Sequence, residues 1–368
     1  MNTTRKPPVY FFLFFFLIYC FKSFIFSLTI DTDTIIYVKG FLNLLIIILC
    51  LFTIFYCPFK VKCLIAVTAG LLVFNTVLFD NKAHYEFLVA ISICVLSKEI
   101  PWRDLIKYIL VIHLIVIVMA APFLFFCDYF FIMDDRFGPR FTGGFDNPNT
   151  IGQYLIMLLS VLSLWISEYC RGRKLQVLIF LFIFLYIILC LYLTYSRTSL
   201  ILAIAMGGAF IFTRMLNYSK RTSKYFFIFP VLLIIIVTFQ FYGIINFGSN
   251  WYLSLANEIF TSRLWFGNLL YNALGLPGIF NGQNIDNYLP IDFYFIRMCY
   301  SVGILYFVAM CLVFLYALKR SRLDIYMWIV LFLMLIDTLT ETYFSVPFYS
   351  ISMFIIFNKT NISDFSKG

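Results

Sequence analysis

Long apolar runs, separated by short polar gaps, follow one another along almost the whole chain. A helix needs about 20 apolar residues to cross the hydrocarbon core of a bilayer, and the pattern predicts about twelve such helices. They are expected at residues 9–28, 36–57, 62–79, 84–98, 105–126, 150–168, 175–194, 197–215, 225–243, 292–318, 324–341 and 344–357. The chain is therefore predicted to be an all-α polytopic membrane protein, with residues 1–368 forming a single integral membrane domain.

Composition supports this prediction, because 63% of the residues are hydrophobic and only 12% are charged, against about 25% charged in soluble domains. The ten cysteines lie almost entirely in or beside apolar runs, without metal-like spacing, and are interpreted as small apolar side chains. The apolar run after Arg5 and Lys6 lacks the small-residue cleavage site of a secretory signal. It is therefore expected to be the first transmembrane helix.

The distribution of basic residues predicts the orientation in the membrane. With the N-terminus in the cytoplasm, all but eight of the 27 lysines and arginines fall in cytoplasmic segments, as the positive-inside rule requires. Both termini are then cytoplasmic, and the two long loops, residues 127–149 and 244–291, lie on the outer face. The net charge of +9 is explained by topology, so a nucleic-acid partner is not needed.

The eight exceptions are informative because they run against this bias, and five of them are arginines. They are Lys22, Lys39, Lys82, Arg136, Arg140, Arg197, Arg263 and Arg297. The guanidinium group of arginine forms paired hydrogen bonds to phosphate. The outer face is therefore the place to look for chemistry.

A first polar segment directly precedes the sixth predicted helix and contains Arg136, Arg140, two adjacent glycines, Asn147 and Asn149. The Asn-Pro-Asn sequence predicts a turn, with Asn149 or Thr150 capping the helix. A capped helix start is one interpretation of this segment. It leaves the two arginines and the two glycines unexplained.

A second polar segment, Thr-Tyr195-Ser196-Arg197-Thr-Ser, interrupts two strongly apolar runs. A cation at membrane depth is expensive unless something pairs with it, so Arg197 is a functional candidate. The alternative is an arginine whose side chain only extends to the outer interface.

The long outer loop and the start of the helix after it hold a third set, comprising Arg263, Tyr288, Asp292, Tyr294 and Arg297. Carboxylate, arginine and aromatic side chains together are suited to binding a glycan carried on a diphosphate. Asp292 has a second interpretation, as a helix N-terminal acid favoured by the helix dipole and paired with Arg297.

Asp337 and Glu341 form a fourth set near the outer end of the eleventh predicted helix. Acids inside a membrane segment are functional candidates, although pairing with Arg197 or Arg263 explains them equally and is favoured here. His84 and His113 lie in or at the edge of apolar runs and are not expected to act as ligands or bases.

Together these motifs resemble the O-antigen polymerase and ligase superfamily. The resemblance covers Arg136 to Glu341 and rests on Arg-Phe-Thr-Gly-Gly-Phe-Asp-Asn-Pro-Asn before a helix, Thr-Tyr-Ser-Arg-Thr-Ser-Leu between helices, and Ser-Arg-Leu in the large outer loop. It also rests on an aspartate eleven residues before the glycine of Val-Gly-Ile-Leu. The resemblance implies a GT-C-like, metal-independent membrane glycosyltransferase without a cofactor. Its essential arginines match Arg197 and Arg263.

The same resemblance implies a polymerase of the Wzy type rather than a ligase, because ligases carry a histidine where this chain has Asp292. The following Phe293 also departs from the Asp-Asn often found in polymerases. The implied substrate is an oligosaccharide on undecaprenyl diphosphate at the periplasmic face of a bacterial inner membrane, with membrane lipids, a flippase and a chain-length regulator as partners. The expected catalytic residues are Arg197, Arg263 and Asp292.

The residues expected to bind substrate are Arg136, Arg140, Asn147, Asn149, Tyr195, Ser196, Tyr288, Tyr294, Arg297 and Glu341. Two other functions stay open at this point. An O-antigen ligase moves finished polymer onto lipid A core, and a flippase carries a lipid-linked glycan across the membrane. A transporter usually has charges paired within several helices and internal repeats, whereas here the polar motifs gather on one predicted side.

Overall fold

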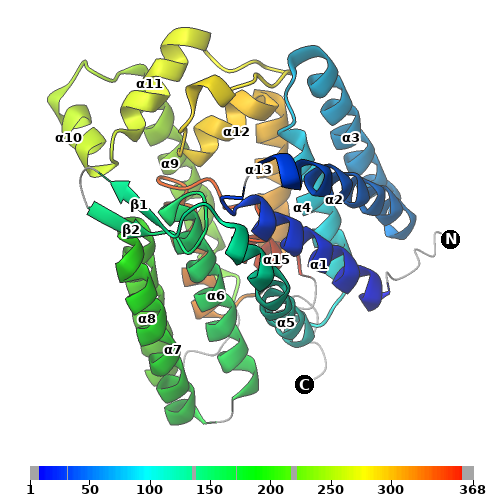
Figure 1. The fold of residues 1–368 in the computed structure, drawn as a ribbon, viewed down its shortest axis with the longest axis vertical. Coiled ribbons are helices and arrows are strands. Elements are labelled where there is room, and N and C mark those ends of the chain that lie inside the picture. The colour runs from blue at the N-terminus through cyan, green and yellow to red at the C-terminus, as the bar shows by residue number, and fades with distance from the viewer. Residues whose placement is uncertain (1–7, 31, 135–137, 171, 217–221, 359–368) are drawn as a thin grey trace.

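The computed structural model describes residues 8–30, 32–134, 138–170, 172–216 and 222–358 (Figure 1). Within these residues, eight helices are long and apolar enough to cross a membrane. They are α1 (Val9–Phe26), α2 (Thr32–Thr53), α3 (Phe59–Phe79), α5 (Trp102–Ala120), α6 (Pro148–Tyr169), α7 (Arg173–Thr194), α8 (Arg197–Met215) and α9 (Ile228–Ile245). The chain is thus an all-α polytopic membrane protein.

Three shorter apolar helices complete the bundle: α4 (His84–Ser97), α13 (Ile304–Lys319) and α14 (Ile325–Asp337). Short 3-10 helices follow or precede several of the long ones, at Ile54–Tyr56, Ala121–Phe126, Lys224–Phe227 and Asp286–Tyr288. The predicted helices before residue 245 correspond closely to those of the structure. Two of the later ones do not.

The predicted helix at residues 292–318 is broken into α12 (Tyr294–Val302) and α13 by Gly303. Gly303 has a φ angle of +85°, a conformation that glycine adopts without the steric cost it carries for other residues. The prediction of one continuous helix was therefore wrong. The break separates α12, most of whose residues are buried, from α13.

The predicted helix at residues 344–357 is also wrong, because only α15 (Ser352–Phe357) is helical. Pro347 disfavours a helix here, since proline lacks a backbone donor and restricts the residue before it. Hydroxyl groups hold the irregular turn instead: Ser352 donates to the Phe344 carbonyl at 2.5 Å, and Ser350 bonds to Ser352 at 2.8 Å.

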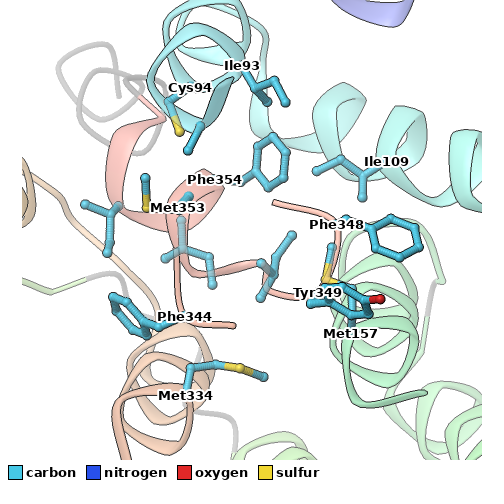
Figure 2. Packing of buried hydrophobic residues seen from close by; sticks show 14 of the residues in the cluster. Ile93, Cys94, Ile109, Met157, Met334, Phe344, Phe348, Tyr349, Met353 and Phe354 are labelled. Atoms are coloured by element: carbon cyan, nitrogen blue, oxygen red, sulfur yellow. The ribbon is translucent and has the colours of Figure 1, made fainter. Parts of the chain in front are cut away.

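This irregular segment is buried inside the protein, which is the condition under which non-helical backbone is tolerated at membrane depth. Figure 2 shows its Phe348 and Tyr349, together with Phe354 of α15, among side chains of α4, α5, α6 and α14. Phe348 stacks on Tyr154 with ring centroids 5.0 Å apart and on His113 at 5.5 Å. His113 is fully buried in this aromatic cluster.

The two long loops contain elements that the sequence did not predict. A β-hairpin of β1 (Phe131–Asp134) and β2 (Gly138–Phe141) lies in the first loop, with Ile132 paired to Arg140. Helices α10 (Trp251–Ile259) and α11 (Arg263–Leu274) lie in the second. Helices α10 and α11 lie at the top of the view in Figure 1, and the hairpin lies below α10, just above α8.

Candidate active site

Arg263, the first residue of α11, lies between two carboxylates. Its Nε is 3.2 Å from Asp292 Oδ2, and its Nη2 is 3.6 Å from Glu341 Oε1. Arg263 and Glu341 are more than nine-tenths buried, whereas the Asp292 side chain is 33% exposed. Neither contact has the alignment of a good hydrogen bond. The three groups therefore form an ion cluster with one open side, at Asp292.

The turn before α11 aims this arginine inward. Thr261 and Ser262 both have positive φ angles, 50° and 67°, which are costly for residues with a Cβ atom. Arg263 Nη1 donates to the Phe260 carbonyl at 3.2 Å and to the Thr261 hydroxyl. Strained backbone of this kind clusters at functional sites because the surrounding structure must hold it in place.

A buried glutamine on α9 positions both acids. Gln240 Nε2 donates to the Thr338 carbonyl at 2.7 Å, and its Oε1 accepts from the Phe295 amide at 3.2 Å. The Thr338 carbonyl also accepts from the Tyr294 amide at 3.1 Å. Gln240 thus ties the start of α12, next to Asp292, to the end of α14, next to Glu341.

Burial raises the pKa values of both acids in the cluster, and the charge of Arg263 opposes this effect. Burial raises the pKa of Asp292, although the guanidinium groups of Arg263 and Arg297 act in the opposite direction. Burial also raises the pKa of Glu341 well above its usual range, and the neighbouring carboxylates of Asp337 and Asp292 add to this effect.

Arg140 organises a second cluster. Its Nε donates to the Thr194 carbonyl at 3.0 Å, its Nη1 to Asp134 Oδ2 at 3.0 Å and its Nη2 to Asn149 Oδ1 at 3.3 Å. The hairpin, the end of α7 and the first turn of α6 therefore meet at one guanidinium group. The structure thus brings together the first and second polar segments of the sequence.

Arg197 begins α8 directly beside this cluster and is exposed. Tyr195, the residue that follows α7, has a φ angle of 50° and turns the chain into the start of α8. The buried hydroxyl of Ser196 donates to Ser199 at 3.0 Å, and both serines pack against Gly152 of α6. In the structure Ser196 joins helices, while Arg197 stays accessible.

The two clusters are connected through α6. The Thr150 hydroxyl lies 3.3 Å from the Tyr343 hydroxyl, and Tyr343 is two residues beyond Glu341. Thr150 follows Asn149, which contacts Arg140. One turn further along α6, the fully buried Gln153 faces Asp337.

The remaining predicted residues occupy different places. Asn147, rather than Asn149 or Thr150, caps α6 by accepting from the Asn149 amide at 2.8 Å, because Pro148 takes the first helical position. Tyr288 packs on a small apolar cluster formed mainly by α9, α11 and α12. Arg136 lies outside the residues that the structure describes.

A polar cavity of about 320 Å³ is at the small end of the range of about 300–1,000 Å³ typical of ligand pockets. Arg263, Asp292 and Glu341 do not line it, but Arg297, whose charge lowers the pKa of Asp292, does. Its walls come from the α3–α4 connection, the start of α4, the outer loop, α12 and the segment after α14. They include Lys82, Glu86, Gln283, Tyr294, Arg297 and Thr342. Tyr294 and Thr342 are close neighbours in sequence of Asp292 and Glu341.

Many of the residues that line the cavity carry hydroxyl or amide groups, among them three with a buried atom that lacks a hydrogen-bond partner. The buried Tyr294 hydroxyl, which faces Ser345, has no well-aligned hydrogen-bond partner, and neither have the Tyr85 hydroxyl and Gln283 Oε1. Asn81 fixes the far wall by donating to the carbonyls of Gln283 and Ser301, at 3.0 and 2.7 Å. Hydroxyl and amide side chains, which both donate and accept hydrogen bonds, are suited to lining a site for a polyhydroxylated ligand.

Sequence reasoning missed Gln240, Gln153, Lys82 and Glu86 as parts of this region. The glutamines left a usable signal, because uncharged polar side chains inside apolar runs need partners. Lys82 had been noted only as a basic residue on the outer side. Within the described residues, no three His, Cys, Asp or Glu side chains gather in a group that could hold a metal ion.

Comparisons of the chain with protein-family models, with curated proteins and with solved structures found no match.

Proposed function

We propose that this protein is a GT-C-like membrane glycosyltransferase that polymerises an O-antigen or related surface polysaccharide. It joins oligosaccharide units carried on undecaprenyl diphosphate at the periplasmic face of a bacterial inner membrane. The observation that carries the proposal is the buried Arg263, placed between Asp292 and Glu341 near a polar cavity.

In the proposed reaction, a sugar hydroxyl of one lipid-linked unit attacks the anomeric carbon of a second lipid-linked glycan. A new carbon–oxygen bond forms, the bond from the anomeric carbon to the diphosphate breaks, and undecaprenyl diphosphate leaves with the bonding electrons. Asp292, the more exposed acid of the cluster, accepts the proton of the attacking hydroxyl.

The arginines stabilise the leaving diphosphate in this proposal. Positive charge fixed in a low-dielectric site stabilises negative charge that develops in the transition state. Arg197 is exposed at the start of α8 and is accessible to a diphosphate. Arg263 lies within the protein, where its charge is poorly screened, and the cavity near it takes the sugar rings.

Purified protein in detergent, given a synthetic undecaprenyl diphosphate oligosaccharide, tests the proposal. We expect a ladder of longer lipid-linked glycans by mass spectrometry, and no extension by the Arg197→Ala or Arg263→Ala variants. Arg173→Ala, which removes an exposed arginine at the start of α7, is the matched control and should retain activity. Extension by either of the first two variants would overturn the assignment.

The same assay separates the other two functions. Product formed on added lipid A core in place of the lipid-linked chain identifies a ligase. A flippase gives no new glycosidic bond in detergent, where there are no compartments.

A further inference from the structure

An apolar groove of about 270 Å³ lies between α3, α4, α13 and α15. The groove and the polar cavity lie at opposite ends of α4. The cavity is next to the start of α4. The groove instead reaches Lys98 and Arg320, the residues that follow the last residues of α4 and α13. The groove therefore has no part in the site described above.

The lining changes in character along the groove. Ile91 and Val95 on α4, with Met310 and Val313 on α13, form apolar walls. Lys98 lies about one turn of helix beyond Val95, so its charge is at one end. Arg320 shares that end, and its guanidinium lies 4.2 Å from the centre of the Tyr316 ring, which also lines the groove.

The charge around this end is positive. Lys62, near the start of α3, and Lys98 both lower the pKa of the nearby Cys57 thiol, although burial raises it overall to about 11. Glu99 follows Lys98 in sequence but does not line the groove. Basic pockets between transmembrane helices are a recurring arrangement for holding anionic lipid headgroups.

We propose that this groove binds one anionic phospholipid from the adjacent leaflet, with its phosphate at Lys98 and Arg320 and an acyl chain along Ile91, Val95 and Val313. Two cations and an apolar trough match the two parts of such a lipid. A zwitterionic lipid offers the same chain without the net negative charge. The groove should therefore select by headgroup.

Native mass spectrometry of the full-length protein in detergent tests this, using phosphatidylglycerol and phosphatidylcholine at equal concentration. We expect a preference for one bound phosphatidylglycerol, and a loss of roughly tenfold to thirtyfold in its affinity in the Lys98→Gln/Arg320→Gln variant. The matched control is Lys107→Gln/Lys174→Gln, which removes two exposed charges outside the groove and should bind as the wild type does.

A second variant tests the groove itself without changing charge. Val313→Trp fills the trough and should release the lipid, while its melting temperature in lipid-free detergent shows whether it is folded. Equal binding of both lipids by the wild type would overturn the proposal. The same conclusion follows if the double glutamine variant binds phosphatidylglycerol as tightly as its control, or if folded Val313→Trp still retains the lipid.

Discussion

Arg263 receives its two carboxylates from distant parts of the chain, Asp292 before α12 and Glu341 after α14. Removing one partner of a buried ion pair is costly because the other charge stays buried without compensation. This asymmetry gives a way to separate the structural and the chemical contribution of Arg263.

We predict that Arg263→Ala lowers the free energy of unfolding by about 3–5 kcal/mol, because Glu341 loses its cation. Adding Glu341→Gln should restore most of this stability, measured by thermal unfolding in detergent. The double variant should still fail to extend glycans. Recovered activity would mean that Arg263 serves only to neutralise Glu341.

A second prediction concerns pH. An Asp292 that accepts a proton must be ionised, and burial raises its pKa above that of an ordinary carboxyl. The rate of extension should therefore fall as the pH is lowered through this raised pKa, at a higher pH than the normal aspartate value of about 3.9 would give. Initial rates over a pH series measure this.

Asp292→Asn should be strongly impaired and should lose this acid limb in any residual activity. Asp286→Asn, an exposed acid of the same outer loop that lines the cavity, should keep it. An unchanged profile in Asp292→Asn would assign the titration to another group.

The sequence identified Arg263, Asp292 and Glu341 individually, because charges in or beside apolar runs are conspicuous. The favoured interpretation, that Glu341 pairs with an arginine, is confirmed by its contact with Arg263. One interpretation of Asp292 paired it with Arg297, but in the structure its ion pair is with Arg263. A local sequence pattern does not show which loops meet in the folded protein. It therefore could not decide which of the arginines pairs with Asp292 or with Glu341.

At the scale of elements, Gly303 separates α12 from α13 and thereby sets the direction of α12, which carries Arg297. A Cβ atom there would lie 3.2 Å from the Ile279 carbonyl oxygen. We predict that Gly303→Ala lowers stability by about 1–2 kcal/mol, the cost of a left-handed conformation for a residue with a Cβ atom. It should also reduce glycan extension.

Gly208→Ala in α8 is the matched control, since a Cβ atom there meets nothing within 4 Å. Alanine is the better helix former, so this change should be neutral or stabilising by up to about 1 kcal/mol. Thermal unfolding of both variants makes the comparison. Equal stability of the two would contradict the proposed constraint at Gly303.

Long helices were predictable because hydropathy over a full membrane span is a strong signal. The short helices α10 and α11 were not, since 9 and 12 residues interrupted by polar side chains do not form a span. Pro347 signalled the irregular turn before α15, but the apolar run around it dominated the interpretation. An apolar run indicates that a segment is buried. It does not distinguish a buried irregular turn from a buried helix.

For the whole molecule, the excess of basic residues in predicted cytoplasmic segments gives a testable orientation. In a variant lacking all ten native cysteines, we predict that Asp286→Cys reacts with a membrane-impermeant maleimide in spheroplasts. Arg173→Cys should react only after the membrane is permeabilised. Both positions are exposed, so the reverse pattern would invert the topology.

The sequence did not predict which segments meet across the bundle. Thr150 and Tyr343, which connect the two arginine clusters, are 193 residues apart. Nothing in either local pattern identifies the other as its partner. The resemblance predicted that the motifs belong to one site, and the three-dimensional arrangement shows which residues are neighbours.

The order in which the cluster is synthesised follows from the position of Glu341 after α14, later in the sequence than both Arg263 and Asp292. While the ribosome makes the protein, Arg263 emerges first, Asp292 second and Glu341 only after α14. A chain that stops before α14 therefore contains Arg263 and Asp292 but not Glu341. It also lacks the Thr338 carbonyl, to which Gln240 donates while it accepts from the Phe295 amide of α12. The ion cluster is complete only in a chain that has been synthesised beyond α14.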